Sequence, residues 1–268
     1  TFGKHTVTGL GVIEARERNV WNMSAKRLNY NINIDEINAG SSDPADISNG
    51  GTSWKERQVG YAFRLGYNYD NRYMAEVSGR YDGHYYFAPG KRFGFFPAFS
   101  LGWNLREESF MKDIEWMDKL KLRLSYGESG NLAGSSYQYM SDYGFGNAVN
   151  LGGIPMMGMW ENLQGNPNIT WEKAKKFDFG VEFSVLNGML SLEADYFYEK
   201  RSNMLMAPNA LVPAEYGIPL SQVNAGSMHN QGIDLSLNFN KRIGKDWMIS
   251  AKGTFTFARN ILDEVFET

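Results

Sequence analysis

The sequence FDFGVEFSVLNGMLSLEADYFY, residues 177–198, decides the fold class. On both sides of Asn187 and Gly188, apolar and polar side chains alternate one by one, which is the period of a β-strand with two different faces. An Asn-Gly pair favours the two-residue turn of a β-hairpin, because both residues readily adopt positive φ. The stretch therefore predicts two antiparallel strands joined by a short turn.

The same alternation recurs along the chain and predicts about nine strands. The clear segments are residues 61–69, 73–82, 120–126, 177–185, 190–198 and 233–239, and the weaker ones are 5–15, 93–103 and 246–257. The composition agrees, since 15% of the residues are aromatic and 29 are glycine. We therefore expect an all-β, antiparallel fold.

The connections between the predicted strands alternate in length. Tight turns fall at 70–72, 187–188 and 243–245, and long polar segments at 18–55, 129–170 and 202–225, with a shorter one at 84–92. Short turns on one side and long loops on the other are typical of transmembrane β-barrels of the outer membrane, with periplasmic turns and extracellular loops. One connection on the turn side, 106–119, spaces Phe110, Ile114 and Met117 as in an amphipathic helix, so we expect a short helix there.

Aromatic residues of the apolar parity mark both ends of the predicted strands, as the interfacial girdles of a barrel require. They are Tyr61, Tyr81, Tyr126 and Tyr198 at the outer ends and Tyr69, Tyr73, Trp103 and Trp247 at the periplasmic ends. A slip of one residue would place Arg64, Arg80 and Arg123 in lipid, at about 2 to 4 kcal/mol each near the midplane. The polar parity therefore faces the lumen, where we expect its charges to pair with one another or to hold a plug.

The composition and the motif content argue against several classes of function. A net charge of -3 gives no reason to expect a nucleic-acid partner, and with 0 Cys neither a disulfide nor a thiolate metal site can form. The three histidines lie far apart, without a ligand at chelating spacing. No phosphate loop, nucleophile elbow or dinucleotide-binding fingerprint occurs. We expect no catalytic residue, no metal, no cofactor and no enzymatic activity.

Six ordered stretches share their pattern with a known family. They are YMAEVSGRYDG (73–83), RFGFFPAFSLGWNL (92–105), LKLRLSYGESGN (120–131), NPNITWEKAKKFDFGVEF (166–183), DYFYEKRSNML (195–205) and NAGSMHNQGIDLSLNF (224–239). Together they resemble the TonB-dependent outer-membrane transporters of the SusC/RagA type. The loop HYYFAP, residues 84–89, departs from the family pattern. The resemblance implies that residues 1–268 are part of one TonB-dependent receptor β-barrel domain, incomplete at both ends.

The same resemblance implies a function and several partners. Transporters of this type import oligosaccharides or peptides, are driven by the TonB complex through an N-terminal region, and are aided by a surface SusD-like lipoprotein. For this chain it implies a place in the cell outer membrane, in contact with lipid, and a barrel domain that lacks that N-terminal region. About nine strands do not close a transporter barrel of about 22, so we expect open sheet edges.

Aromatic residues in the long loops are the candidate substrate contacts, since their rings suit sugar rings or peptide side chains. The candidates are Trp54, Tyr137, Tyr139, Tyr143, Trp160 and Tyr216. For each, the alternative is packing of one loop against another.

For the whole chain, one alternative is a soluble carbohydrate-binding β-sandwich, which would bury its apolar faces. Another is an outer-membrane enzyme or a passive porin.

Overall fold

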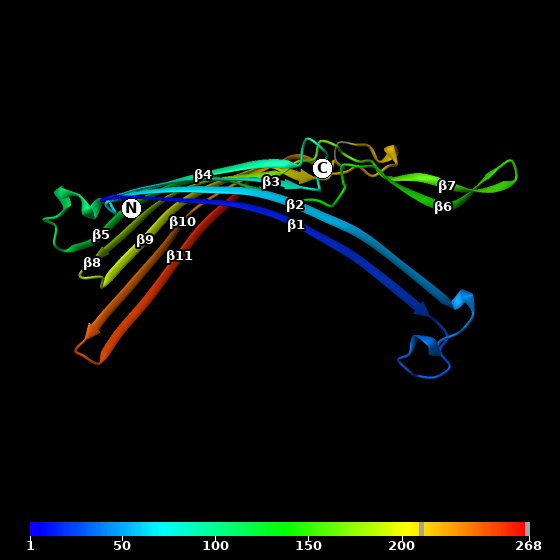
Figure 1. Ribbon diagram of the computed structural model, residues 1–268, viewed down its shortest axis with the longest axis horizontal. Helices are drawn as coiled ribbons and strands as arrows, with labels where there is room; N and C mark the ends of the chain where they lie inside the picture. Colours follow the sequence, from blue (N-terminus) through cyan, green and yellow to red (C-terminus); the bar gives the residue numbers. More distant parts are fainter. Residues whose placement is uncertain (209–211, 266–268) are drawn as a thin grey trace. The chain divides into compact units, whose positions relative to one another are not determined.

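The computed structural model describes residues 1–208 and 212–265, apart from the side chains of 147–149 and 214. Within these residues the chain forms a nine-stranded sheet and a separate two-stranded sheet (Figure 1). The strands of the large sheet are β1 (His5–Arg27), β2 (Ile47–Tyr69), β3 (Tyr73–His84), β4 (Phe93–Asn104), β5 (Met117–Asn131), β8 (Glu172–Val185), β9 (Leu190–Met206), β10 (Val223–Ile243) and β11 (Trp247–Glu264). From β3 onward, neighbouring strands pair antiparallel. The predicted all-β antiparallel fold is confirmed.

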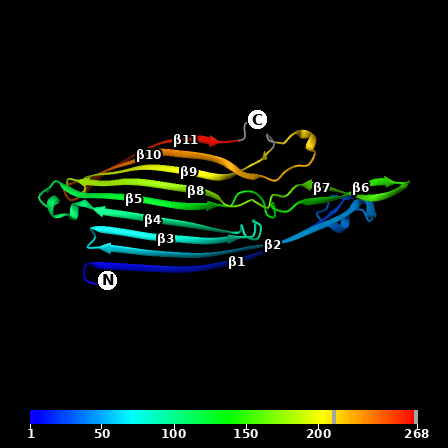
Figure 2. The ribbon, with the colours of Figure 1, turned by 90° about the horizontal axis from the view of Figure 1, so that it is seen from above.

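The strands of the large sheet follow one another in chain order, and only the β6–β7 pair is left out of the sequence (Figure 2). β1 and β11 stand at the two ends of this order and do not pair with each other in the described residues. The expectation that about nine strands leave two open edges is therefore confirmed. None of the helices in the described part of the chain is long and apolar enough to cross a membrane.

The chain divides into two compact units, Thr1–Ile13 with Gly60–Thr268 and, separately, Glu14–Val59. The second unit consists of β1 from Glu14 onward, β2 as far as Val59, and the connection between them. This connection contains two 3-10 turns, Ile37–Ala39 and Pro44–Asp46. The predicted loop over 18–55 is confirmed for 28–46 and was wrong for 18–27 and 47–55, which are strand. These strand parts are exposed on both faces and so show no apolar alternation. Backbone pairing and contacts such as Arg57 Nε to Glu17 Oε2, at 2.8 Å, take the place of an apolar face.

The predicted tight turns are present where the sequence placed them. Asp70 and Asn71 have φ of 53° and 54°, as a type I′ hairpin turn requires. Asn187 and Gly188 have φ of 55° and 76° between β8 and β9. The turn at Asn187 and Gly188 fixes the register of β8 against β9, which sets Val185 opposite Leu190.

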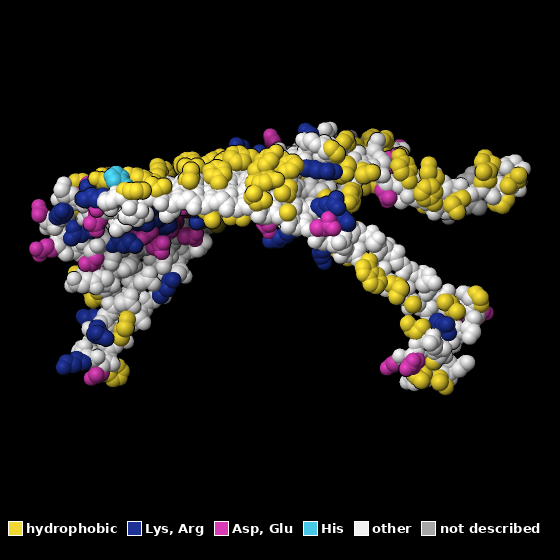
Figure 3. Space-filling model, in the orientation of Figure 1, with side chains coloured by type: hydrophobic (Ala, Val, Ile, Leu, Met, Phe, Trp, Pro, Cys, Tyr) yellow, Lys and Arg dark blue, Asp and Glu magenta, His cyan; other side chains and the backbone are white. Residues whose placement is uncertain are grey.

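The large sheet carries an apolar face, formed by alternate residues of its strands. Members of this face that are 37% to 58% exposed are Phe63, Leu65, Val77, Phe99, Leu101, Phe179, Leu192, Leu237, Phe255 and Phe257. Cross-strand pairs join them, for example Val77 with Phe99 and Leu237 with Leu192. Figure 3 shows hydrophobic side chains gathered along one side of the sheet. The β-sandwich alternative required this face to be buried, and in the chain it is exposed.

Aromatic rings occupy both ends of the apolar face, as predicted. At the turn side, the ring of Tyr73 stacks on those of Tyr69 and Trp103, with centroids 6.3 Å and 6.5 Å away. At the loop side, the rings of Tyr81 and Phe93 stack with centroids 4.9 Å apart. Rings with an apolar body and a polar edge suit the two borders of a bilayer.

Two further predictions about the connections were wrong. Instead of a helix, residues 106–119 contain parts of two 3-10 turns, Leu105–Glu107 and Ser109–Met111, and the first residues of β5. The guanidinium of Arg106 donates to the carbonyl oxygens of Met111, at 2.9 Å, and Met117, at 2.6 Å, and so closes the segment into a compact turn. So short a segment also nucleates a helix poorly.

The second error concerns 129–170, which the sequence suggested was a loop. It contains a hairpin of β6 (Asp142–Leu151) and β7 (Ile154–Leu163). Gly152 and Gly153, with φ of 63° and 86°, form its turn. Gly-Gly is a hairpin signal, but the flanking segments are rich in glycine and methionine and lack clean alternation. The connection over 202–225 is also shorter than predicted, because β9 continues to Met206 and β10 begins at Val223.

Candidate functional site

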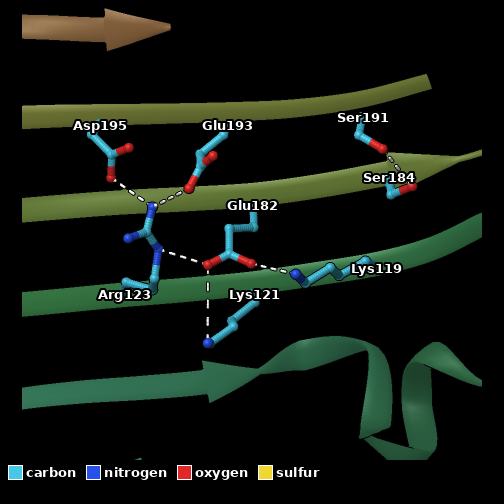
Figure 4. Close-up of polar contacts among 8 residues, drawn as sticks. All are labelled: Lys119, Lys121, Arg123, Glu182, Ser184, Ser191, Glu193 and Asp195. Atoms are coloured by element: carbon cyan, nitrogen blue, oxygen red, sulfur yellow. Dashed lines mark hydrogen bonds and ion pairs between the residues drawn. The ribbon is translucent and has the colours of Figure 1, made fainter. Parts of the chain in front are cut away.

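The polar face of the large sheet, formed by the residues that alternate with the apolar face, carries a network of ion pairs (Figure 4). The Arg123 side chain of β5 reaches across two strands. Its Nε lies 2.8 Å from Glu182 Oε1 on β8, and its Nη2 lies 2.8 Å from Asp195 Oδ1 and 3.1 Å from Glu193 Oε1 on β9. One guanidinium therefore joins three neighbouring strands through charge-assisted contacts.

Other charges on the polar face pair in the same way. The pairs are Arg64 with Glu76, Arg80 with Asp82, Lys119 and Lys121 with Glu182, and Lys176 and Arg201 with Glu199. The prediction that charges of this face pair with one another is confirmed for these residues. Such pairing keeps the face hydrophilic while it compensates the paired charges.

A small apolar core lies where the loop-side ends of the strands meet the connections. Phe87, Phe96, Ile169 and Trp171 are at most 7% exposed, and Tyr86 and Leu205 pack against them. The indole Nε1 of Trp171 donates to the carbonyl oxygen of Arg92 at 3.0 Å. The core joins the 85–92 connection to the residues just before β8, so it gives the surrounding loops a fixed base.

Three tyrosines form what we call the tyrosine platform, Tyr85, Tyr137 and Tyr139. The ring centroids of Tyr85 and Tyr137 lie 5.6 Å apart with an edge-to-face angle of 63°, and those of Tyr137 and Tyr139 lie 6.3 Å apart. The Tyr137 side chain is 44% exposed. Two of the predicted substrate contacts are therefore brought together, along with a residue from the divergent HYYFAP loop.

Gln138 holds the backbone of the platform in place. Its Oε1 accepts from the Ser135 backbone N–H at 3.1 Å, and its Nε2 donates to Gln222 Oε1 at 3.3 Å. Its carbonyl oxygen accepts from the Ser221 hydroxyl at 2.8 Å and from the Asn166 backbone N–H at 3.2 Å. These bonds tie the platform to the connection before β8 and to the one before β10.

The other four predicted substrate contacts lie outside the tyrosine platform. Tyr143 and Trp160 are on the β6–β7 hairpin, 49% and 43% exposed, and Trp160 lies against Gly144, where an added Cβ would meet its ring at 2.7 Å. Tyr216 donates its hydroxyl hydrogen to Gln164 Oε1 at 2.7 Å. Trp54 belongs to the other compact unit, and its Nε1 donates to Glu56 Oε1 at 3.0 Å.

The sequence reading missed two groups of residues. Tyr85 completes the platform and Gln138 supports it, and the sequence signal for Tyr85 was that residues 84–89 depart from the family pattern. The other is Glu108, which is buried in the connection between β4 and β5. Its Oε1 accepts from the Tyr73 hydroxyl at 2.6 Å and from Trp103 Nε1 at 3.0 Å. One carboxylate thus holds two aromatic residues at the turn-side end of the apolar face.

These contacts also change the acidity of Glu108. The Tyr73 hydroxyl, then the Trp103 indole N–H, and the nearby Arg72 guanidinium favour the charged carboxylate and hold the pKa of Glu108 below its ordinary value. In the turn before β3, the Lys4 ammonium lowers the pKa of Asp70 in the same way, at an Nζ to Oδ2 distance of 2.7 Å. Among the described residues, no group of three or more His, Cys, Asp or Glu side chains is arranged to hold a metal ion.

Comparison with known proteins identifies the family to which this architecture belongs. The family described as TonB dependent receptor-like, beta-barrel matches residues 4–267. The chain belongs to the TonB-dependent receptor β-barrel family. Within this family it is of the SusC/RagA type, as the six sequence stretches indicated. It is 30% identical to the TonB-dependent receptor SusC of Bacteroides thetaiotaomicron over 212 residues, which are 75% of the chain and 20% of SusC.

Two further relatives agree with this membership. The chain is 35% identical over 175 residues to TonB-dependent receptor P26 of Formosa agariphila, covering 65% of the chain and 17% of that receptor. It superimposes on the structure of the RagAB peptide importer in the closed-closed state with a TM-score of 0.87 and 25% identity, over 98% of the chain and 29% of that one. The chain thus spans about a fifth of the length of these curated relatives. These relatives are receptors and an importer.

Proposed function

We propose that the chain is part of one β-barrel domain in the outer membrane, within a receptor that imports large nutrients such as oligosaccharides or peptides in a TonB-dependent way. The observation that carries this proposal is the exposed apolar face of the large sheet, with aromatic rings at both ends. In water an exposed apolar face of this kind favours aggregation, whereas against lipid it is the normal outer surface of a barrel.

In this proposal the two faces have separate roles. The apolar face contacts outer-membrane lipid, and the polar face lines a lumen in which paired charges keep the wall hydrated. The long connections point outward and contact the substrate through Tyr137, Tyr139, Tyr143, Trp160 and Tyr216. Trp54, on β2 in the other compact unit, is a separate candidate contact. No step of this function requires the chain to act as an enzyme.

Membership of the SusC/RagA type supports the proposal of two protein partners. A SusD-like surface lipoprotein would cover the extracellular loops and deliver substrate. The TonB complex would act on a part of the receptor outside these residues and supply the energy for import. The similarity to SusC and to the RagAB structure supports both partners.

Membrane fractionation of cells that express the whole receptor tests the proposal. Folded barrels resist detergent, so we expect the receptor in the outer-membrane fraction and a gel mobility that changes on boiling. Recovery as a soluble protein with no change on boiling would overturn the barrel assignment. If the fractionation succeeds, import of the bound nutrient should stop when the TonB gene is deleted, and import that continues would contradict the TonB-dependent mechanism.

A further inference from the structure

The apolar face of the large sheet changes in character toward the loop-side ends of β5 and β8 to β11. Side chains that stand directly opposite one another on paired strands form rows across this face. One row is apolar and consists of Leu124, Phe179, Tyr196, Ile233 and Phe257. Two residues closer to the loops, the second row consists of Tyr126, Phe177, Tyr198, Gln231 and Arg259. Two residues further, the third row consists of Glu128, Lys175, Lys200, His229 and Ile261. The face therefore passes from apolar to largely aromatic to charged side chains.

Cations gather at the charged end of this face. Lys175 on β8 stands directly opposite Lys200 on β9, a position in which like charges destabilise a sheet. Lys173 lies on the same face, two residues beyond Lys175, and Arg259 lies in the second row. We call these four residues the basic cluster. Within the described ranges 1–208 and 212–265, no carboxylate forms an ion pair with Lys173, Lys200 or Arg259. The sheet thus holds these cations together at an electrostatic cost.

The carboxylates on this part of the face do not balance the basic cluster. Glu128 Oε1 lies 3.7 Å from Lys175 Nζ, whose side chain is still 52% exposed. Asp263 Oδ1 lies 2.6 Å from His229 Nδ1. On β5 and β8 to β11, the four cations of the cluster therefore outnumber these two carboxylates, although the net charge of the chain is -3.

The polar face of the same strands treats its cations differently. One residue away from Lys175, Lys176 pairs with Glu199 at an Nζ to Oε2 distance of 3.1 Å, and Arg201 pairs with the same carboxylate. The excess of positive charge is therefore a property of the face that the proposed function places against lipid.

Lipid headgroups can supply the missing anions. An aromatic row marks the border between hydrocarbon and headgroups, so the charged row beyond it lies at headgroup depth. Phosphate oxygens accept strong hydrogen bonds from ammonium and guanidinium groups, and basic residues at a membrane surface attract anionic lipids. We propose that a phosphate-bearing headgroup of an outer-leaflet lipid binds to the basic cluster, Lys173, Lys175, Lys200 and Arg259. The assignment rests on the proposed place in the outer membrane and goes beyond it by naming a lipid site.

Native mass spectrometry of the whole receptor in detergent tests this assignment. The probes are lipid A with its phosphate groups and the same lipid A after their enzymatic removal, each titrated into receptor that its gel mobility before and after boiling shows to be folded. We expect the dephosphorylated lipid to bind at least about tenfold more weakly, since several cations lose their anion. Equal binding of the two lipids would overturn the assignment. Displacement of the phosphorylated lipid by inorganic phosphate at the same concentration would assign the cluster to a soluble anion and would also overturn it.

Substitutions on the two faces of the same strands then locate the site. Lys175→Gln combined with Lys200→Gln should weaken binding of the phosphorylated lipid about thirtyfold, since each cation near a membrane surface contributes about fivefold. Lys175→Arg combined with Lys200→Arg keeps both charges and should retain most of the binding. Lys176→Gln combined with Arg201→Gln removes two cations from the polar face of β8 and β9, so it is the matched control and should leave binding unchanged. Wild-type binding by the first pair, or an equal loss in the control, would overturn the basic cluster as the site.

The failure of this assignment differs from a failure of the proposed function. A receptor that is folded in the outer membrane and shows no preference for the phosphorylated lipid overturns the lipid site and leaves the import function standing. A second protein that leaves the receptor when Lys175 and Lys200 are replaced by Gln, while lipid binding is unchanged, would make the cluster a protein interface and overturn the lipid site. A receptor absent from the outer membrane would overturn the import function and, with it, the assignment that depends on it.

Discussion

The two faces of the large sheet share one backbone and differ only in the parity of their residues. Val77 and Ser78 are neighbours on β3, yet Val77 stands opposite Phe99 on the apolar face and Ser78 stands opposite Ala98 on the polar face. On the apolar face, aliphatic and aromatic side chains remain exposed, whereas on the polar face charges such as Arg123 and Arg64 pair with carboxylates of neighbouring strands. The difference indicates that the sheet separates two environments.

This contrast explains why register matters more here than any single contact. A shift of one residue would move every charged side chain to the apolar face and every apolar one to the polar face. The type I′ turn at Asp70 and Asn71 and the turn at Asn187 and Gly188 therefore do more than reverse the chain. They fix which environment each side chain meets.

The largest expected effect comes from placing a charge on the apolar face. Val77→Arg should cost about 2 to 4 kcal/mol if the side chain meets hydrocarbon near the midplane. The measurement is the amount of heat-modifiable receptor in the outer membrane. Ser78→Arg, one residue away on the polar face, is the matched control and should assemble nearly as well as wild type. Equal yields of the two variants would contradict the assignment of the faces.

A smaller loss is expected at the centre of the polar face. Arg123→Ala removes the cation that three carboxylates share and leaves Glu193 and Asp195 close together. We expect the receptor to lose about 1 to 3 kcal/mol of stability, the range for hydrogen bonds to charged groups, measured by denaturant titration in detergent. Removal of Arg123 without any change in the unfolding midpoint would show that the network does not stabilise the wall.

The turn-side end of the apolar face should respond to pH through Glu108. Because its pKa is lower in the folded protein, its stabilising effect is complete above its ordinary pKa of 4.5 and disappears as the pH falls through the lower folded value. Glu108→Gln should therefore lower the temperature of the gel-mobility shift at neutral pH and have little effect in strong acid. A difference that is the same at both pH values would contradict this role of the carboxylate.

The smallest effect is expected for an exposed ion pair on the same polar face. The side chains of Arg64 and Glu76 are 59% and 40% exposed. Arg64→Ala should change stability by less than about 1 kcal/mol, since exposed pairs contribute little. The same denaturant titration measures the free energy of unfolding of Arg64→Ala beside that of Arg123→Ala. A loss of stability for Arg64→Ala as large as that for Arg123→Ala would show that the bridging of three strands by Arg123 adds no stability.

Much of the sheet was predictable because alternation records the two environments directly. The nine predicted segments fall on the nine strands of the large sheet, the last of them beginning one residue before β11, and the aromatic ends follow the predicted parity. Residues 18–27 of β1 and 47–55 of β2 were missed, because a strand that is exposed on both faces has no reason to alternate apolar and polar side chains. The β6–β7 hairpin was missed for a related reason, and the expected helix after Arg106 failed because side chain to backbone contacts set that turn.

The candidate site was less predictable than the sheet. Composition pointed to loop aromatics, but the meeting of Tyr137 with Tyr85 depends on a contact between residues far apart in the chain. The positive φ of Tyr137 and the role of Gln138 depend on hydrogen bonds from three different connections, and no local pattern records those. The substrate role of these aromatics, and of Trp54 and Tyr216, stays a prediction.

The central claim, that alternate residues of one sheet face lipid and a watery lumen, is tested most directly with single cysteines. The chain contains 0 Cys, so each introduced thiol is unique within it. Val77→Cys and Phe99→Cys, compared with Ser78→Cys and Ser100→Cys, would carry an environment-sensitive fluorophore in the whole receptor in membranes. We predict that bilayer-dissolved nitroxides quench the first two and that a water-soluble quencher reaches the other two. The same quenching at all four positions, or the reverse pattern, would contradict the claim.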